Sequence, residues 1–181
     1  MNGVEIRAAR VDDAREILEI YGYYVSRTAV SFEYDVPTVE EFRQRMAKTL
    51  EKYPYFAAVR GNHIAGYAYA GPFIERAAYQ YAAEVTIYLA ADERRQGIGK
   101  ALYGALEAAL GEMGIRNLYA CIGWPAAEDE YLTWDSARFH ERMGYVKCGK
   151  FHKCGYKFGR QYDMIWMEKI IGCVQNDHGL W

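Results

Sequence analysis

Residues 81–100 read YAAEVTIYLAADERRQGIGK. Apolar and polar side chains alternate over residues 81–90, which predicts a strand with Glu84 on its polar face. Gly97 and Gly99 then open a segment whose apolar residues recur on one helical face. This part of the chain is therefore expected to form a strand, a short loop and an amphipathic helix.

Shorter strands and helices are predicted on both sides of this unit. The other predicted strands cover residues 4–9, 55–60, 64–70, 118–122, 145–151 and 162–170. We expect an α/β (α+β) fold, with a mixed, mostly antiparallel sheet of six to seven strands and about four helices. The chain is divided into a single domain at residues 1–172 and a polar C-terminal tail at 173–181.

Composition narrows the classes of function. The 181 residues are 51% hydrophobic and 25% charged, which indicates a globular protein with a substantial core. The net charge of -2 argues against nucleic-acid binding, and no apolar run is long enough to span a membrane. The N-terminus shows no export-signal pattern, so we expect a cytoplasmic protein. The four cysteines form no CxxC pair, so we expect free thiols and no metal site.

The loop before the amphipathic helix is suited to binding phosphate. Glycine lets a ligand approach the backbone, and the first amides of a helix have no partner within it. Arg94, Arg95 and Lys100 add three positive charges beside Gly97 and Gly99. The loop is therefore predicted to hold a pyrophosphate, although the two glycines alone would equally suit a simple strand–helix turn.

The segment from Arg94 to Gly99 resembles motif A of the GNAT-type N-acetyltransferase superfamily, Arg/Gln-x-x-Gly-x-Gly/Ala. Further segments resemble the phosphinothricin N-acetyltransferase-like branch, in the same order along residues 4–170. They are VSFE at 30–33, GPFIERAAYQYAAE at 71–84, HERMGY at 140–145 and GYKFGRQYD at 155–163. The chain is thereby identified as a member of this branch, and a homodimer is implied.

The resemblance also implies acetyl-CoA as co-substrate. A bulged central strand would contact its pantetheine arm, and the loop would hold its phosphates. The implied cofactor-binding residues are Ile87, Tyr88, Leu89, Arg94, Arg95, Gln96, Gly97, Ile98, Gly99, Lys100, Thr133 and Ser136. Thr133 stands where relatives have an asparagine, so one of two amide functions would be missing.

Acetyl transfer to an amine requires a base, an oxyanion donor and a protonated thiol leaving group. Glu84 is the candidate base; the alternative is a solvated carboxylate at a strand end. A backbone N–H near Ile87 or Tyr88 would be the oxyanion donor. His140 is the candidate proton donor to the thiolate, or a packed histidine at a helix end.

The acceptor is expected to be a small primary amine, first an amino acid or an analogue such as phosphinothricin or methionine sulfone. Arg76 would bind its carboxylate, and Phe32, Glu33, Phe73 and Tyr79 are further candidates, with core packing as the alternative for the aromatic residues. Ile74 replaces a basic residue of the branch. The acidic insertion at 125–132 would favour a cationic amine if it lay over the acceptor, or it is a solvated loop.

The sequence is also compatible with other functions. They are acetylation of polyamine or protein amines, a non-catalytic acyl-CoA-binding sensor, and a dinucleotide enzyme. The dinucleotide reading lacks the acidic ribose partner expected about 20 residues after the loop, where the sequence has Ala120.

Overall fold

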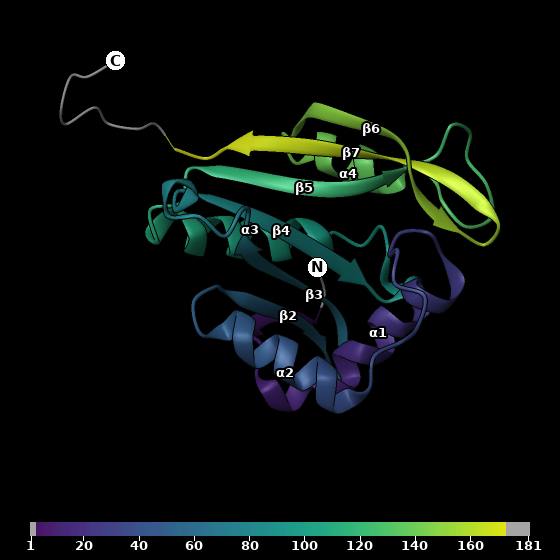
Figure 1. Ribbon diagram of the computed structural model, residues 1–181. Helices are drawn as coiled ribbons and strands as arrows, with labels where there is room; N and C mark the ends of the chain where they lie inside the picture. Colours follow the sequence, from purple (N-terminus) through teal and green to yellow (C-terminus); the bar gives the residue numbers. More distant parts are fainter. Residues whose placement is uncertain (1–2, 173–181) are drawn as a thin grey trace, which may run out of the picture.

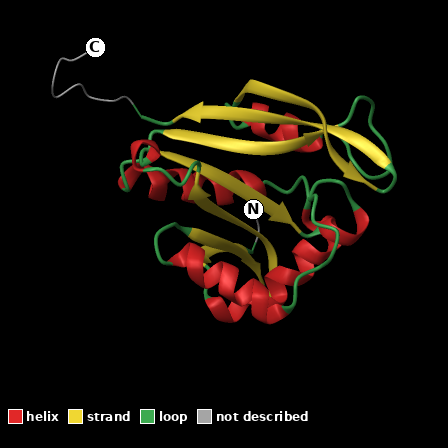
Figure 2. Cartoon of the chain, in the orientation of Figure 1, coloured by secondary structure: helices red, strands yellow, loops and turns green. Residues whose placement is uncertain are grey.

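The computed structural model describes residues 3–172 and contains one seven-stranded sheet with helices on both faces (Figures 1 and 2). The strands are β1 (Val4–Ala8), β2 (Tyr55–Arg60), β3 (His63–Pro72), β4 (Ala82–Leu89), β5 (Asn117–Trp124), β6 (Val146–Lys157) and β7 (Arg160–Ile170). The α-helices are α1 (Ala14–Arg27), α2 (Val39–Leu50), α3 (Ile98–Glu112) and α4 (Asp135–Arg142). Three short 3-10 turns are η1 (Val11–Asp13), η2 (Ala77–Tyr79) and η3 (Ala91–Glu93).

The strand order is β1-β2-β3-β4-β5-β7-β6, and β4–β5 is the one parallel pair in this sheet of the described chain. This confirms the predicted fold class. The predicted tail at 173–181 lies outside the described residues.

The sheet separates two apolar cores. One lies against α3 and the other against α1 and α2. Strand β3 shows how the sequence creates this division, because residues 67–70 read YAYA and successive side chains point to opposite faces. The tyrosines enter the core with α1 and α2, and the alanines enter the core with α3. Small side chains on that face leave room for α3 against the sheet.

The feature of the fold that positions the site is the divergence of β5 from β4. These strands pair only from Ala82–Asn117 to Glu84–Tyr119 and then diverge. The expected bulge in the central strand is wrong, because β4 pairs with β3 without a register shift from Ala83 to Leu89. The backbone of β4 is made accessible by the departure of β5, not by a bulge.

Two local predictions differ from the structure. Strand β6 runs to Lys157, beyond the predicted end at Phe151, because a register shift at residues 151–155 keeps it paired with β7. The amide of Lys153 donates to Asp163 Oδ1 at 2.7 Å and fixes this irregularity. Asp13 is the N-cap residue of α1, and an aspartate there is expected to cap the helix through its side chain, but its carboxylate binds Arg7 through two 2.8 Å hydrogen bonds.

Candidate active site

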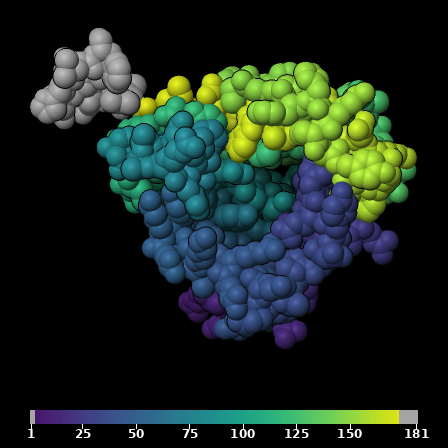
Figure 3. Space-filling model, viewed as in Figure 1, coloured from purple at the N-terminus to yellow at the C-terminus, as the bar shows by residue number. Residues whose placement is uncertain are grey.

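Two adjoining cavities open where β4 leaves β5. The larger is a cleft of about 870 Å³ between β4, the loop at 94–100 and α4. The smaller, of about 290 Å³, extends from it toward Glu84. Both are lined by Ile87 and Tyr88, so a ligand in one would meet a ligand in the other at these residues. The space-filling view shows the surface hollowed over the middle of the chain, between the N-terminal helices and the C-terminal strands (Figure 3).

The predicted phosphate loop borders the larger cleft. Gly97 has a left-handed backbone (φ 83°) and directly precedes α3, a conformation that favours glycine. Gly99 lies under α4, because an added Cβ would be 2.9 Å from Phe139 Cε2. A larger residue there would push the Phe139 ring, which itself lines the cleft.

Most of the predicted cofactor-binding residues line this cleft. They are Ile87, Tyr88, Leu89, Arg94, Arg95, Gly97, Gly99, Lys100, Thr133 and Ser136. Gln96 and Ile98 do not belong to the lining. The Gln96 side chain donates to the carbonyl of Asp92, and Ile98 is fully buried in the core with α3.

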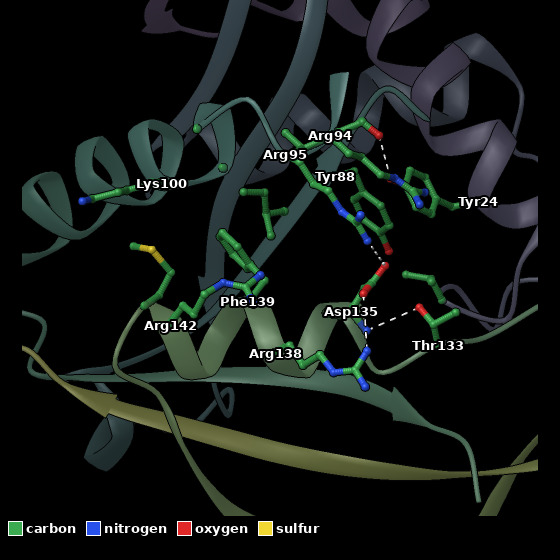
Figure 4. A pocket seen from close by; sticks show the side chains of 17 residues that line it. Tyr24, Tyr88, Arg94, Arg95, Lys100, Thr133, Asp135, Arg138, Phe139 and Arg142 are labelled. Atoms are coloured by element: carbon green, nitrogen blue, oxygen red, sulfur yellow. Dashed lines mark hydrogen bonds and ion pairs between the residues drawn. The ribbon is translucent and has the colours of Figure 1, made fainter. Parts of the chain in front are cut away.

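The cleft is strongly cationic (Figure 4). Its basic residues are Arg94, Arg95, Lys100, Arg138 and Arg142. Asp135 is the one acidic residue of the lining in the described chain; it lies 3.9 Å from Arg95 and 3.8 Å from Arg138. Sequence reasoning missed Arg138 and Arg142. Their spacing of four residues on a helix places them on one face, which was the available signal.

The backbone of β4 offers unpaired amides to the cleft. The Ala90 amide donates to the Ala65 carbonyl of β3 at 2.9 Å. Because alternate residues of an antiparallel strand bond to the same neighbour, the Tyr88 amide also turns toward β3. The amides of Ile87 and Leu89 therefore face the side that β5 has left, and Ile87 is the better placed of the two predicted oxyanion donors.

Among residues 3–172, Glu84 contributes the one carboxylate that lines the smaller cavity. Burial raises the pKa of Glu84 above its ordinary value. Cys121 lines the same cavity, and burial followed by the nearby charge of Glu84 raises its pKa to about 12, so the thiol stays protonated at neutral pH. No Lys or Arg of residues 3–172 lines this cavity.

His140 is buried beside the smaller cavity. Its Nδ1 lies 2.7 Å from the Ser136 carbonyl and its Nε2 lies 2.8 Å from the Tyr103 hydroxyl. A carbonyl only accepts, so Nδ1 carries the proton and Nε2 accepts from Tyr103. Burial lowers the pKa of His140 to about 4, so the ring is neutral at pH 7. Tyr103 also lines the cavity, and sequence reasoning missed it because it reads as one more residue on the buried face of α3.

The predicted acceptor residues are spread over a wider area than this cavity. Phe32 lines it, and Glu33 forms a 2.6 Å ion pair with Arg45 of α2. Phe73 stacks on Tyr119 with ring centroids 4.1 Å apart. Arg76 and Tyr79 are exposed on the connection between β3 and β4; like Phe73, they line neither cavity.

The loop that carries Phe32 is held firmly. Lys157 is buried and its Nζ donates to the Ser31 carbonyl at 2.6 Å. The Phe32 ring lies in space left by Gly155, where an added Cβ would be 2.4 Å from Phe32 Cε1. These contacts fix one wall of the smaller cavity.

The three acidic residues of the insertion at 125–132 are all paired with arginines, and the two arginines leave one negative charge in excess. Glu128 pairs with Arg138 at 3.0 Å, whereas Asp129 and Glu130 pair with Arg160 at 3.0 and 2.7 Å. The insertion therefore presents little free negative charge to an acceptor.

Residues 3–172 were compared with the requirements of a membrane-spanning helix and of a metal site, and they meet neither. No helix among them is long and apolar enough to cross a membrane. Within residues 3–172, no three His, Cys, Asp or Glu side chains converge on a point where a metal ion could bind.

Comparisons of the sequence and of the fold with known proteins point to one family. The model of the acetyltransferase (GNAT) domain family matches residues 6–166. The phosphinothricin N-acetyltransferase of Streptomyces viridochromogenes is 32% identical over 89% of this chain and 84% of its own length. That of Alcaligenes faecalis is 35% identical over 92% of this chain and 82% of its own. A crystal structure of a GNAT superfamily phosphinothricin acetyltransferase from Sinorhizobium meliloti in complex with AcCoA superimposes with a TM-score of 0.86, at 32% identity, covering 93% of this chain and 89% of that one.

Proposed function

The chain belongs to the GNAT family of N-acetyltransferases, and from this premise we propose that it transfers the acetyl group of acetyl-CoA to the primary amine of an amino acid or amino-acid analogue. The observation that carries the proposal is the meeting of the two cavities at Ile87 and Tyr88. A thioester in the larger cleft and an amine in the smaller cavity would be in contact there.

The larger cleft fits the cofactor in three ways. Its five basic residues complement the phosphates, and the Leu89 amide can pair with the pantetheine arm, which leaves the Ile87 amide for the thioester carbonyl. Gly99 keeps the floor of the cleft free of a side chain. Acetyl-CoA would supply an activated acetyl group on a thiol that leaves readily.

Glu84 would act as the general base. The carboxylate takes a proton from the substrate ammonium, and the free amine then forms its bond to the acetyl carbon. The Ile87 amide donates to the carbonyl oxygen as negative charge develops on it. The bond to sulfur breaks last, the second proton of the nitrogen passes to the departing thiolate, and Glu84 releases the first proton to solvent.

We assign His140 a role through Tyr103. Its low pKa leaves less than about one ring in a thousand protonated at pH 7, so it stores almost no proton for the thiolate. Because His140 Nε2 accepts the hydrogen bond from the Tyr103 hydroxyl, the lone pairs of that oxygen are left free to accept from a ligand. The Tyr103 oxygen can then accept a hydrogen bond from the amine beside Glu84.

The choice of acceptor is supported by the relatives and by the paired insertion. Both relatives are phosphinothricin N-acetyltransferases, and the acids at 128–130 that would attract a polyamine are bound to arginines. Arg76 stays the predicted carboxylate ligand; it would have to reach the acceptor from outside the cavity lining. A homodimer likewise stays a prediction.

The test is thiol release from acetyl-CoA with a panel of free amino acids, methionine sulfone, phosphinothricin, polyamines and short peptides. We expect turnover on an amino acid or analogue, and loss of that turnover in Arg76→Gln. Turnover confined to polyamines or peptides would contradict the acceptor class. CoA binding without acetylation of any amine in the panel would favour a non-catalytic acyl-CoA-binding sensor over an enzyme.

A further inference from the structure

Tyr24 occupies an unusual position at the mouth of the larger cleft. It lies on α1, is 6% exposed and belongs to the cleft lining. Its hydroxyl donates to the Leu89 carbonyl at 2.6 Å and accepts from Arg94 Nη2 at 3.2 Å. The Arg94 guanidinium also lies over the Tyr24 ring, 5.4 Å from its centroid. One hydroxyl thus joins the end of β4 to the beginning of the phosphate loop (Figure 4).

Arg94 differs from the other arginines of the cleft in the partners of its guanidinium. Arg95 faces Asp135, and Arg138 faces both Glu128 and Asp135. Arg94 forms no ion pair with a carboxylate of residues 3–172, and its side-chain partner there is the neutral Tyr24. A tyrosine can orient a guanidinium without neutralising it, so the full charge is left for a ligand.

Holding the long Arg94 side chain in one orientation should strengthen its binding of an anion by a measurable amount. A free arginine loses rotamer entropy when it binds an anion, and a side chain already held in place loses less. The ring of Tyr24 is itself fixed by Tyr88, with centroids 4.9 Å apart. The hydroxyl is therefore a rigid anchor for Arg94.

We propose that Tyr24 is a positioning residue for the cofactor, which holds Arg94 over the pyrophosphate position and aligns the phosphate loop with the carbonyl of Leu89. The inference rests on the proposed function, because it takes CoA as the ligand of the cleft. Loss of the hydroxyl should weaken binding of ligands that carry the phosphates and leave phosphate-free ligands unaffected. A hydroxyl that served only to hold α1 against β4 would not distinguish these ligands.

The test compares dissociation constants of CoA and of pantetheine, which lacks the pyrophosphate, by titration calorimetry. Tyr24→Phe keeps the ring and its packing. We expect it to bind CoA roughly 10-fold more weakly, the usual effect of one hydrogen bond to a charged group, with pantetheine within about twofold of wild type. Tyr23→Phe is the matched control, since Tyr23 is the exposed neighbour on the same helix and lies outside the cleft lining. It should match the wild type for both ligands.

A double-mutant cycle identifies the partner. In an Arg94→Gln background, most of the loss of CoA affinity caused by Tyr24→Phe should disappear, because the contact with the Arg94 guanidinium is already gone and only that with the Leu89 carbonyl is left. If Tyr24→Phe does not fold, Arg94→Lys tests the same contact from its other end, since an ammonium keeps the charge and loses the oriented guanidinium. It should then lose CoA affinity and keep that for pantetheine.

Three results would contradict the proposal. They are unchanged CoA affinity in Tyr24→Phe, equal losses for CoA and pantetheine, and additive losses in the double variant. Failure of the wild-type protein to bind CoA is a different outcome, because it would overturn the proposed function itself.

Discussion

At the scale of single residues, Glu84 has the most demanding position in the site. Its carboxylate lies where β4 loses its pairing with β5, half-buried in a cavity whose lining includes several tyrosines. The raised pKa makes the carboxylate a stronger base, but turnover requires its ionised form. We therefore expect kcat/KM to fall as the pH falls through the pKa of Glu84.

Glu84→Gln removes the base and keeps the shape of the side chain. Turnover at neutral pH should fall by about 10²-fold or more, and the acidic limb of the pH profile should disappear. CoA affinity should not change, because Glu84 lies outside the larger cleft. Thermal stability should stay equal or rise, since a buried charge is lost. Glu112→Gln, an exposed change at the end of α3, is the control; equal turnover in both variants would exclude Glu84 as the base.

The low pKa of His140 leads to a second prediction, which concerns the pH dependence of the free energy of unfolding. Its folded pKa of about 4 is below the ordinary value of 6.5, so between these pH values the unfolded chain takes up a proton that the folded chain does not. The neutral ring therefore stabilises the fold above pH 6.5, and this contribution is lost as the pH falls toward 4. One such group contributes at most about 1.4 kcal/mol per pH unit.

Urea denaturation from pH 7.5 to 4.5 measures this effect. The free energy of unfolding should fall less steeply with acid in His140→Gln than in the wild type. His152→Gln, which alters an exposed histidine of β6, should keep the wild-type slope. Parallel slopes for all three proteins would show that His140 titrates normally in the folded chain.

At the scale of elements, the contact of α3 with α4 controls access to the cleft. An added Cβ at Gly99 would lie 2.9 and 3.2 Å from two carbons of the Phe139 ring. Gly99→Val should push this ring into the cleft and weaken CoA binding by roughly 100-fold or more, without unfolding the chain. Gly104→Ala is the matched change on α3, since nothing lies within 4 Å of its added Cβ. It should keep CoA affinity and gain about 1 kcal/mol of stability from helix propensity. Wild-type affinity in Gly99→Val would mean that the ligand binds elsewhere.

The elements also show which features of the structure local sequence patterns can predict. The alternation in β4, with the glycines and basic residues that follow it, predicted the strand and the phosphate loop, because these signals are local. The other predicted residues of the cleft lining were implied by the resemblance to the GNAT superfamily. The start of α2 follows an equally local rule, because residues 38–41 read TVEE and Thr38 and Glu41 form a capping box there. Tyr24 and Tyr103 were not predicted, since each reads as a core residue of an amphipathic helix. Their roles depend on partners in distant strands and helices, at Leu89 and His140.

On the acceptor side too, short motifs predicted some positions and not others. Phe32 could be placed from a short motif, and the structure brings it to the smaller cavity. Phe73, Arg76 and Tyr79 come from a comparable motif, but the path of the β3–β4 connection takes them out of the lining. No local pattern encodes the direction in which an exposed connection leaves a sheet. The ion pairs of the insertion at 125–132 were likewise beyond sequence reasoning, because Arg160 is contributed by the distant strand β7.

At the scale of the whole molecule, the cleft lies between two parts of the sheet. Strands β1–β4 and β5–β7 are joined by three residue pairs of β4 and β5 and by the core against α3. The cleft lining draws on α1, β4 and the phosphate loop from one side and on α4 from the other. A ligand that fills the cleft therefore contacts both parts and binds only the folded chain, so it should stabilise the molecule as a unit.

The size of this stabilisation can be predicted. CoA at 100 times its dissociation constant should add about 2.7 kcal/mol to the free energy of unfolding. For a chain of this size, that corresponds to a rise in Tm of roughly 5–10 °C. ATP and NAD, tested at the same concentration by thermal denaturation, share the phosphates and adenosine but lack the pantetheine arm that would pair with the Leu89 amide of β4. They should therefore shift Tm much less. A larger shift with NAD would favour the dinucleotide reading of the glycine loop, whereas a shift with CoA that disappears in Gly99→Val would locate the stabilising ligand between Gly99 and Phe139.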